Sequence, residues 1–448
     1  MNIDGKKISI LGAVRSGIAS AKLAKQNGAI PFVSDLSDTK EIRKGIEALD
    51  TIGVKYELGQ HSEKIYDCDF IVTSPGIPSK SSVLTVAQEK GLKVISEIEF
   101  ASWFCDGKII AITGTNGKTT TTSLCAHVIN SAGKKCYTAG NIGLPFSEIT
   151  MSVKPEEFVA LEVSSFQLDF INDFKPDISI LLNITPDHLD RYENRYDLYI
   201  KSKMRVAENQ DSSNIFIYNG DDDNIPIGYV SNKINLFPFS LDKSLSNGSF
   251  VDEGWILFNN DYNVTEICNV DDLSLKGEHN LQNALAVINV AMNIGIDTEL
   301  IKIGLMTFQG VEHRLEFVRD VYGISFINDS KATNVDAVWF ALRSFDTPIF
   351  LILGGTDKGN EYGKIKEEVQ NRVKKIFAIG TSAEKIIKYF QSITNVEKVE
   401  SLDEAVNKGL QEANSGEYIL LSPACASFDM FENYEDRGNQ FKEIVNQL

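Results

Sequence analysis

The chain has 448 residues, more than one hydrophobic core usually organises, so we expect two or three domains. Hydrophobic residues make up 43% and charged residues 24% of the chain, a balance typical of soluble globular proteins. The formal net charge of −18 repels nucleic acid and anionic membranes, so we expect neither as a partner.

The sequence also lacks the usual signals for secretion or membrane insertion. No apolar run reaches the length that spans a bilayer, and residues 1–7 lead directly into a short strand-like run. The six cysteines are scattered without a C-x-x-C pair, which indicates reduced thiols, not a disulfide framework or a zinc site. We therefore expect a cytoplasmic protein, and we take it to be a monomer.

Strand-like and helix-like stretches alternate along the whole chain, which predicts an α/β fold with mainly parallel sheets. The pattern restarts with a short β-rich run at three places, residues 7–12, 108–114 and 323–328. Each restart can open a separate doubly wound sheet. We place the domain edges near residues 98 and 310, which predicts domains at 1–98, 99–310 and 311–448.

The first chemical motif in the chain is a glycine turn. Gly12 and Gly17 follow the first strand-like run, and Asp35 ends the next one, as in one half of a dinucleotide-binding fingerprint. Val14 stands where the middle glycine would let a pyrophosphate approach closely. A structural turn and a mononucleotide site are both compatible with this pattern, and a complete NAD site fits it less well.

The strongest motif is Thr113-Gly114-Thr115-Asn116-Gly117-Lys118-Thr119-Thr120, between an apolar strand and a helix-like run. Glycines let backbone N–H groups converge on phosphate oxygens, and a helix N-terminus adds positive charge. Lys118 can reach the β and γ phosphates of a nucleotide, and the Thr119 hydroxyl can bind Mg²⁺. A chance Gly-Lys turn is the alternative, and Ile112 departs from the strict phosphate-loop pattern.

Two further side chains follow strands in the middle of the chain. Glu162 ends an apolar run, where an acid beside a phosphate loop commonly holds Mg²⁺, although a helix cap or a salt bridge would also explain it. His188 lies in a polar turn after the next strand-like run. A ligand or catalytic role and a merely hydrogen-bonded histidine both remain open for His188.

Taken together, these motifs resemble those of the Mur ligase family. That family shares a T-G-T-x-G-K-[ST] loop, an N-x-x-x-D-H-x-D turn and a G-x-H-N-x-x-N segment, which occur here at 113–119, 183–190 and 277–283. Within the family, the members that add D-glutamate are similar at residues 74–78, 162–168, 328–334 and 421–429. The resemblance covers the whole chain in order.

The resemblance implies an ATP-dependent amide ligase that adds D-glutamate to UDP-N-acetylmuramoyl-L-alanine through an acyl phosphate, in peptidoglycan precursor synthesis. It implies a Rossmann-like N-terminal domain for the UDP end, a central P-loop ATPase-like domain, and a Rossmann-like C-terminal domain for the amino acid. ATP and two Mg²⁺ ions are the expected cofactors. Lys203 is expected to be present as a carbamate.

Carried over position by position, the resemblance implies four sets of site residues. The ATP set is Gly114, Thr115, Asn116, Gly117, Lys118, Thr119, Thr120, Asn283, Arg314 and Asp329. The UDP-substrate set is Gly12, Ser16, Gly17, Asp35, Ser74, Gly76, Asn141, Ser164 and His188. The D-glutamate set is Lys331, Thr333, Lys358, Ser427 and Phe428, and the metal set is Thr119, Glu162, His188 and Lys203. Of these, the expected catalytic residues are Lys118, His188 and Lys203.

Three other functions compete with this interpretation. A folylpolyglutamate synthase shares the ligase architecture, but the first Rossmann-like unit and residues 74–78 argue against it. An NAD-dependent oxidoreductase built on Gly12 and Gly17 leaves Lys118 without a role. A P-loop NTPase switch does not account for His188 or Lys203.

Overall fold

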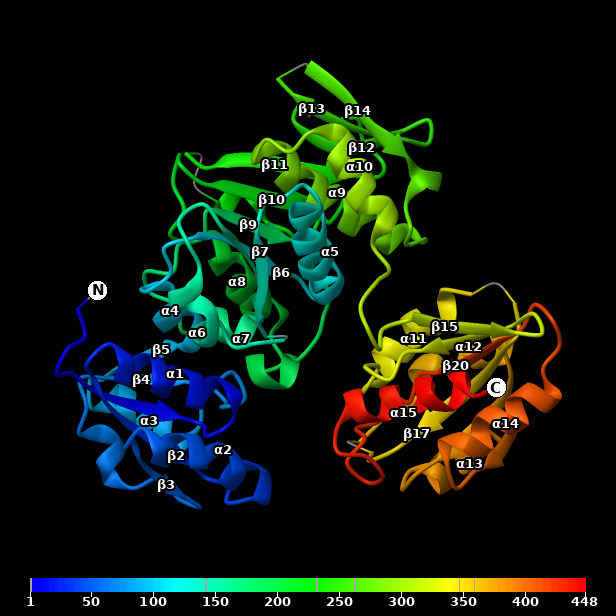
Figure 1. Ribbon diagram of the computed structural model, residues 1–448, viewed down its shortest axis with the longest axis horizontal. Helices are drawn as coiled ribbons and strands as arrows, with labels where there is room; N and C mark the ends of the chain where they lie inside the picture. Colours follow the sequence, from blue (N-terminus) through cyan, green and yellow to red (C-terminus); the bar gives the residue numbers. More distant parts are fainter. Residues whose placement is uncertain (1, 142, 231–232, 262, 346, 358) are drawn as a thin grey trace. The chain divides into compact units, whose positions relative to one another are not determined.

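The computed structural model describes residues 2–141, 143–230, 233–261, 263–345, 347–357 and 359–448. It is a three-domain α/β protein with three mainly parallel sheets, as the sequence predicts (Figure 1). The chain divides into two compact units, Met1–Phe308 and Gln309–Leu448. None of the helices in the described ranges is long and apolar enough to cross a membrane. Lys358, which the sequence assigns to the amino-acid site, lies outside the described residues.

The N-terminal sheet has five parallel strands in the order β3-β2-β1-β4-β5. The strands are β1 (Lys7–Leu11), β2 (Ile30–Asp35), β3 (Lys55–Leu58), β4 (Phe70–Thr73) and β5 (Lys93–Ser96). The helices are α1 (Arg15–Gln26), α2 (Lys40–Thr51), α3 (Ser82–Glu89) and α4 (Glu97–Ser102). The strand order reverses beside β1, and ligands of such sheets bind in the crevice at that reversal.

The central sheet has nine strands in the order β14-β13-β12-β11-β10-β9-β6-β8-β7. Its strands are β6 (Lys108–Thr113), β7 (Cys136–Gly140), β8 (Phe158–Glu162), β9 (Ile178–Leu181), β10 (Ile215–Asn219), β11 (Asn235–Ser240), β12 (Gly248–Asp252), β13 (Trp255–Asn260) and β14 (Asn263–Asn269). Strands β13 and β14 pair antiparallel, and β6 runs parallel between β8 and β9. The carboxyl ends of β6, β8 and β9 therefore meet at one edge.

The central helices carry or cover the phosphate-binding edge. They are α5 (Lys118–Ser131), α6 (Phe146–Ile149), α7 (Ser165–Leu168), α8 (Tyr196–Met204), α9 (Glu278–Asn293) and α10 (Thr298–Thr307). Helix α5 follows β6 directly and packs against β7, β8, α9 and α10. This packing holds the N-terminus of α5 at the carboxyl edge of the sheet.

Helix α4 fastens the N-terminal sheet to the central one. Glu99, whose side chain is fully buried, accepts hydrogen bonds from the backbone N–H groups of residues 172–174 at 2.7–3.1 Å and from Trp103 Nε1 at 3.0 Å. Glu97 accepts from Ser147 N at 2.6 Å. One hydrophobic core contains buried residues of both sheets, from Ile3 to Ile234. The two sheets of this unit are therefore packed together.

The C-terminal unit contains a six-stranded sheet in the order β15-β16-β20-β17-β18-β19, in which only the β15–β16 pair is antiparallel. The strands are β15 (Glu316–Val321), β16 (Ile324–Asn328), β17 (Ile349–Gly354), β18 (Val373–Ile379), β19 (Asn395–Lys398) and β20 (Tyr418–Leu421). The helices are α11 (Val335–Arg343), α12 (Lys366–Arg372), α13 (Ala383–Phe390), α14 (Leu402–Glu412) and α15 (Tyr434–Asn446).

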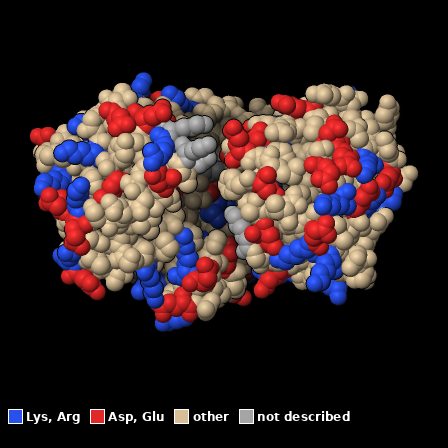
Figure 2. Space-filling view, turned by 90° about the horizontal axis from the view of Figure 1, so that it is seen from below, with Lys and Arg blue, Asp and Glu red and all other residues tan. Residues whose placement is uncertain are grey.

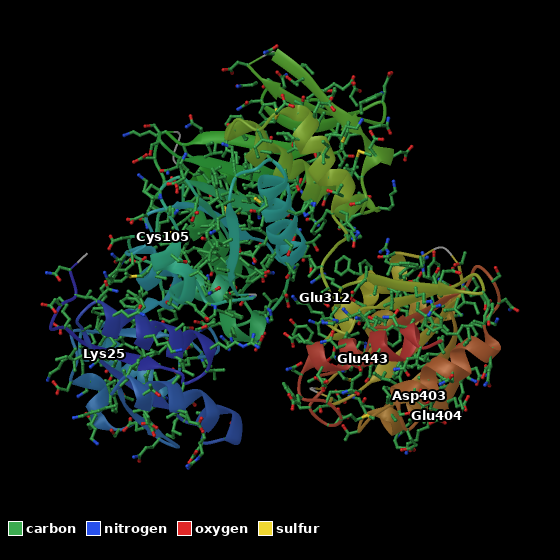
Figure 3. The ribbon with its side chains drawn as sticks, viewed as in Figure 1. Lys25, Cys105, Glu312, Asp403, Glu404 and Glu443 are labelled. Atoms are coloured by element: carbon green, nitrogen blue, oxygen red, sulfur yellow. The ribbon has the colours of Figure 1, made fainter. Side chains whose placement is uncertain are left out.

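The central strands of this sheet, such as β17, are buried on both faces. Alternate residues of β17 enter different cores, Leu351 and Leu353 on one side and Phe350 and Ile352 on the other. A two-sided core explains why β17 is apolar throughout, since neither face of a covered parallel sheet meets water. Glu312, labelled in Figure 3, precedes β15 and forms an ion pair with Lys442 of α15.

Charged side chains are distributed over both units. On the face in Figure 2, acidic and basic residues are interspersed. The whole chain has 62 acidic and 44 basic residues, which gives the net charge of −18. Many of them form exposed ion pairs such as Lys7–Asp67 and Lys175–Asp211. Exposed pairs of this kind contribute little to stability.

We expect Glu99→Ala to lower the free energy of unfolding of residues 1–308 by at least ~3 kcal/mol, because several buried donors lose their acceptor. Glu99→Gln, which keeps one acceptor oxygen and the shape, should lose less. Thermal or urea unfolding measures both, with the exposed Glu89→Ala as control. Equal stability of Glu99→Ala and Glu89→Ala would contradict this role for Glu99.

Candidate active site

The phosphate loop lies in the turn between β6 and α5. Gly117 precedes the helix with a φ of +82°, and a Cβ there would lie 2.6 Å from Asn283 Oδ1. Glycine is required here because the backbone is left-handed and a Cβ would clash with the Asn283 side chain. The first turn of α5, which contains the buried Thr119 and Thr120, directs its backbone N–H groups towards the loop. The local structure is therefore that of an anion-binding helix N-terminus.

Residues that follow β9 hold this loop in shape. Thr115 N donates to Asn183 O and Asn116 N donates to Asn183 Oδ1, both at 2.9 Å. Thr115 Oγ1 lies 3.1 Å from the hydroxyl of the buried Tyr199. Asn183 begins the N-x-x-x-D-H-x-D motif, but neither Asn183 nor Tyr199 was predicted as a site residue. The position of Asn183 just beyond β9 could have indicated a role at the loop, because β9 lies next to β6 and the loop follows β6.

Two lysines converge on one carbonyl of the loop. Lys118 Nζ donates to Gly114 O at 2.9 Å and to Thr115 O at 2.7 Å, and Lys203 Nζ donates to Gly114 O at 2.7 Å. Lys203 is only 2% exposed. Burial, followed by the charge of Lys118, holds the pKa of Lys203 well below its usual value. The two predicted catalytic lysines thus meet at one backbone acceptor, and the environment of Lys203 favours its neutral amine.

A hydroxyl and a carboxylate face each other beside the loop. Thr119 Oγ1 donates to Glu162 Oε2 at 2.9 Å, and Asn141 Nδ2 donates to Glu162 Oε1 at 2.9 Å. Glu162 is buried at the end of β8, in register with Ile112 of β6. Among the described residues, no group of three His, Cys, Asp or Glu side chains could hold a metal. Thr119 and Glu162 fit Mg²⁺, which binds few protein ligands and keeps water and phosphate oxygens.

His188 lies in a tight turn after β9. Its φ is +51° and its side chain is 54% exposed. The ring packs against Phe166 at 5.2 Å between centroids, and Nε2 lies 3.6 Å from Asp187 Oδ2. The charge of Asp187 also acts on Lys203. The turn that contains Asp187 and His188 therefore lies close to the two lysines. Ser164, predicted to contact the same substrate, caps α7 and accepts from Gln167 N at 3.3 Å.

Four predicted UDP-substrate residues meet at the carboxyl ends of β1, β2 and β4. Gly12 has a φ of +98°, and a Cβ there would lie 2.6 Å from Ser74 Oγ. A Cβ on Gly17 would lie 1.7 Å from Gly12 O, so α1 and the turn touch. Asp35 Oδ2 accepts from Ala13 N at 2.7 Å. Ser16 lies in the first turn of α1, at the strand reversal where ligands bind.

In the C-terminal unit, Asp329 is buried at the end of β16. It accepts hydrogen bonds from Ser422 Oγ at 2.7 Å and Leu315 N at 3.2 Å. Burial raises the pKa of Asp329 to about 7, and the Ser422 hydrogen bond and the charge of Arg314 oppose this rise. The charge of Arg314 acts on the Asp329 carboxyl, so these two residues, both assigned to the nucleotide, lie close together. Asn283, assigned to the same nucleotide, lies instead in residues 1–308, beside the phosphate loop.

The predicted amino-acid residues come from two loops. Lys331 N donates to His313 O at 3.0 Å, and Thr333 N donates to Lys331 O at 2.9 Å, so both belong to the tight loop after β16. Ser427 and Phe428 follow β20, where Ser427 is buried and Phe428 is 71% exposed. The strands β16 and β20 are neighbours, which brings the two loops to the same edge.

Arg437, which was not among the predicted site residues, joins these loops. Its guanidinium donates to Ser330 O at 2.8 Å and to Cys425 O at 3.2 Å, and it is almost completely buried. Burial lowers the pKa of Arg437 to about 10. A buried arginine with hydrogen bonds to two loop backbones fixes their spacing.

The three domains each match a described family model. Residues 7–83 match the MurD N-terminal domain, residues 112–291 the Mur ligase middle domain, and residues 313–425 the Mur ligase, glutamate ligase domain. The chain belongs to the Mur ligase family.

Its relatives include enzymes named UDP-N-acetylmuramoylalanine–D-glutamate ligase. The one from Christiangramia forsetii is 45% identical over 449 residues, which cover 99% of this chain and 100% of the relative. The one from Chloroherpeton thalassium is 43% identical over 472 residues, which cover 100% and 99%.

Solved structures share the fold at lower identity. UDP-N-acetylmuramate–alanine ligase from Thermotoga maritima has a TM-score of 0.59 and 20% identity, and the likeness covers 99% of each chain. MurF ligase from the same organism, in complex with ADP, has a TM-score of 0.58 and 16% identity, and covers 99% of this chain and 96% of that one.

The raised pKa of Asp329 predicts a pH dependence of stability. Between its ordinary value of 3.8 and about 7, folded Asp329 retains a proton that the unfolded chain has released. This carboxyl therefore lowers the free energy of unfolding as pH rises across that interval. We expect the melting temperature of Asp329→Asn, measured relative to that of the unsubstituted chain, to rise as the pH is raised from about 5 to about 8.

The exposed Asp403→Asn, at the position labelled in Figure 3, is the control, since an exposed carboxyl should not produce such a trend. Melting curves at both pH values measure the effect. If the difference between Asp329→Asn and the unsubstituted chain did not change with pH, Asp329 would titrate at an ordinary value.

Proposed function

We propose that this chain is an ATP-dependent ligase that joins D-glutamate to UDP-N-acetylmuramoyl-L-alanine and releases ADP and phosphate, in peptidoglycan precursor synthesis. The observation that carries the proposal is the convergence of Lys118 and Lys203 on Gly114 O, beside the Thr119–Glu162 pair. The positive charge of Lys118 and of the N-terminus of α5 suits a step in which two anions, a carboxylate and a triphosphate, must approach each other. The shared name of the full-length relatives supports D-glutamate as the amino acid.

The first step of the proposed reaction activates the carboxylate of the UDP substrate. A carboxylate oxygen attacks the γ-phosphorus of ATP, the bond to the β–γ bridging oxygen breaks, and an acyl phosphate and ADP result. Lys118 and the N–H groups at the start of α5 bind phosphate oxygens and stabilise the charge that builds up there. Mg²⁺ held by Thr119 and Glu162 would neutralise further phosphate charge.

The second step forms the amide bond. The amino group of D-glutamate attacks the acyl carbon, the tetrahedral intermediate loses phosphate, and the nitrogen releases a proton. We assign the D-glutamate site to Lys331, Thr333, Ser427 and Phe428, and also to Lys358 from the resemblance alone. Donors from two separate loops can bind both carboxylates of the amino acid, which would discriminate against L-glutamate and D-aspartate.

The remaining assignments follow the domain order. We assign residues 1–98 to the UDP end of the substrate, 99–310 to ATP and 311–448 to the amino acid. The crevice around Gly12, Ser16, Gly17, Asp35, Ser74 and Gly76 is the proposed UDP site, and Asn141, Ser164 and His188 would contact the muramoyl end. Asn283, Arg314 and Asp329 would bind the nucleotide together with the phosphate loop.

We also propose that Lys203 carries a carbamate. The neutral amine of lysine forms an N–C bond with CO₂ and releases a proton, and the product offers two oxygens that Mg²⁺ can bind beside His188. An ammonium group has three donors and no acceptor, so it could not hold a metal. Burial of Lys203 and its lowered pKa favour the neutral amine that this reaction requires.

The function is tested by the release of inorganic phosphate from ATP. We expect release only when UDP-N-acetylmuramoyl-L-alanine and D-glutamate are both present. Lys118→Ala should lower kcat by at least ~10²-fold, because one charge acting on the transferring phosphoryl is lost. Release with a folate substrate, or release that does not depend on either co-substrate, would contradict the proposal.

The carbamate predicts a loss of activity that a small acid can reverse. Lys203→Ala should reduce kcat strongly, and added acetate should restore part of it by supplying oxygens in the vacated space. The neighbouring Lys201→Ala, which lies on the exposed side of α8, should remain active. Full activity of Lys203→Ala, or no labelled carbon on the protein after incubation with labelled bicarbonate, would show that the carbamate is absent.

A further inference from the structure

Arg191 connects the N-terminal sheet to the His188 turn of the central sheet. Its guanidinium donates to Pro75 O at 3.2 Å and to Gly76 O at 3.0 Å. These carbonyls belong to the loop after β4, whereas Arg191 lies three residues beyond His188. The planar guanidinium matches two adjacent acceptors, so it fixes both the distance and the orientation of the loop.

The loop that Arg191 holds also touches the glycine turn. Ser74 N donates to Leu11 O at 3.1 Å, and the Ser74 hydroxyl lies against the Cα of Gly12, where a Cβ would be only 2.6 Å away. The two segments at the strand reversal thus form one surface. Arg191 binds the side of that surface that faces the central sheet.

The other side of Arg191 contacts the aromatic group next to His188. The guanidinium lies 4.2 Å from the centroid of the Phe166 ring, and the same ring packs edge-on against His188 at 5.2 Å. Phe166 belongs to α7, which Ser164 caps. A continuous set of contacts therefore runs from the UDP crevice through Arg191 and Phe166 to His188.

We propose that Arg191 is a positioning residue of the ligase reaction. This inference rests on the proposed function, in which the UDP crevice binds one end of the substrate and phosphoryl transfer occurs at the other. The distance between the two ends must then be set by the protein. Arg191 sets it by fixing the loop at 74–76 to the His188 turn, so that the bound carboxylate meets the γ-phosphate. A displacement of about 1 Å at such a site can cost ~10²-fold in rate.

A purely structural role for Arg191 is the competing explanation. The two sheets are already joined by a shared core and by Glu97 and Glu99 of α4, so their association does not depend on Arg191. The same two segments are also joined by the exposed ion pair Lys80–Glu193. That pair makes Lys80→Ala a matched control, since it removes a neighbouring link that has no contact with Phe166.

The experiment compares Arg191→Ala, Arg191→Lys and Lys80→Ala with the unsubstituted ligase. Three quantities are measured: kcat for phosphate release at saturating substrates, the Kd for UDP-N-acetylmuramoyl-L-alanine by calorimetry, and the melting temperature. We expect kcat of Arg191→Ala to fall by ~10–100-fold with Kd and melting temperature close to those of the unsubstituted chain. Arg191→Lys keeps the positive charge over Phe166 and one hydrogen bond, so its kcat should lie between those of Arg191→Ala and the unsubstituted chain. Lys80→Ala should match the unsubstituted chain in all three quantities.

Three results would overturn the inference: unchanged kcat in both Arg191 variants, a weakened Kd with normal kcat, or equal losses in Lys80→Ala. The second would make Arg191 a ligand of the substrate, and the third would make it one of several structural links. If Arg191→Ala does not fold, Arg191→Lys is sufficient for the test. An unsubstituted chain that releases no phosphate with its three substrates would instead refute the proposed function.

Discussion

The carbonyl oxygen of Gly114 accepts hydrogen bonds from two lysine side chains, and the candidate active site is organised around this shared acceptor. Lys203 is buried there, and burial together with the charge of Lys118 holds the pKa of Lys203 well below its usual value, which favours its neutral amine. Lys118 and the N-terminus of α5 supply the positive charge at the loop, which suits phosphate and carboxylate groups.

The residues proposed to bind the UDP substrate and the ATP phosphates lie mainly within residues 1–308. A core shared by two sheets, together with buried Glu97 and Glu99, holds the UDP crevice and the phosphate loop in a defined relation. In the proposed reaction, this packing would reduce the entropy cost of aligning the carboxylate with the γ-phosphate. The amino-acid loops belong to a unit with its own two-sided core, in which Arg437 sets the loop spacing.

Several elements were predictable from the sequence because their signals are local. The phosphate loop follows from glycines and a lysine between an apolar strand and a helix, and Glu162 follows from its position at a strand end. Asn183, Tyr199, Arg191 and Arg437 were not predictable in the same way. Each acts on a segment distant along the chain, such as Arg191 on Gly76, and polar residues of these types are common on any surface.

The sequence by itself determined the three α/β domains, the anion-binding turn and the family, because strand alternation and glycine turns depend on residues close in the chain. Only the tertiary structure decided which residues meet at the site. Strand order brings Glu162 and Asn183 beside β6, and packing buries Lys203 against Gly114. Such contacts join segments tens of residues apart, and the reduced charge of a buried lysine follows from desolvation that no local pattern encodes.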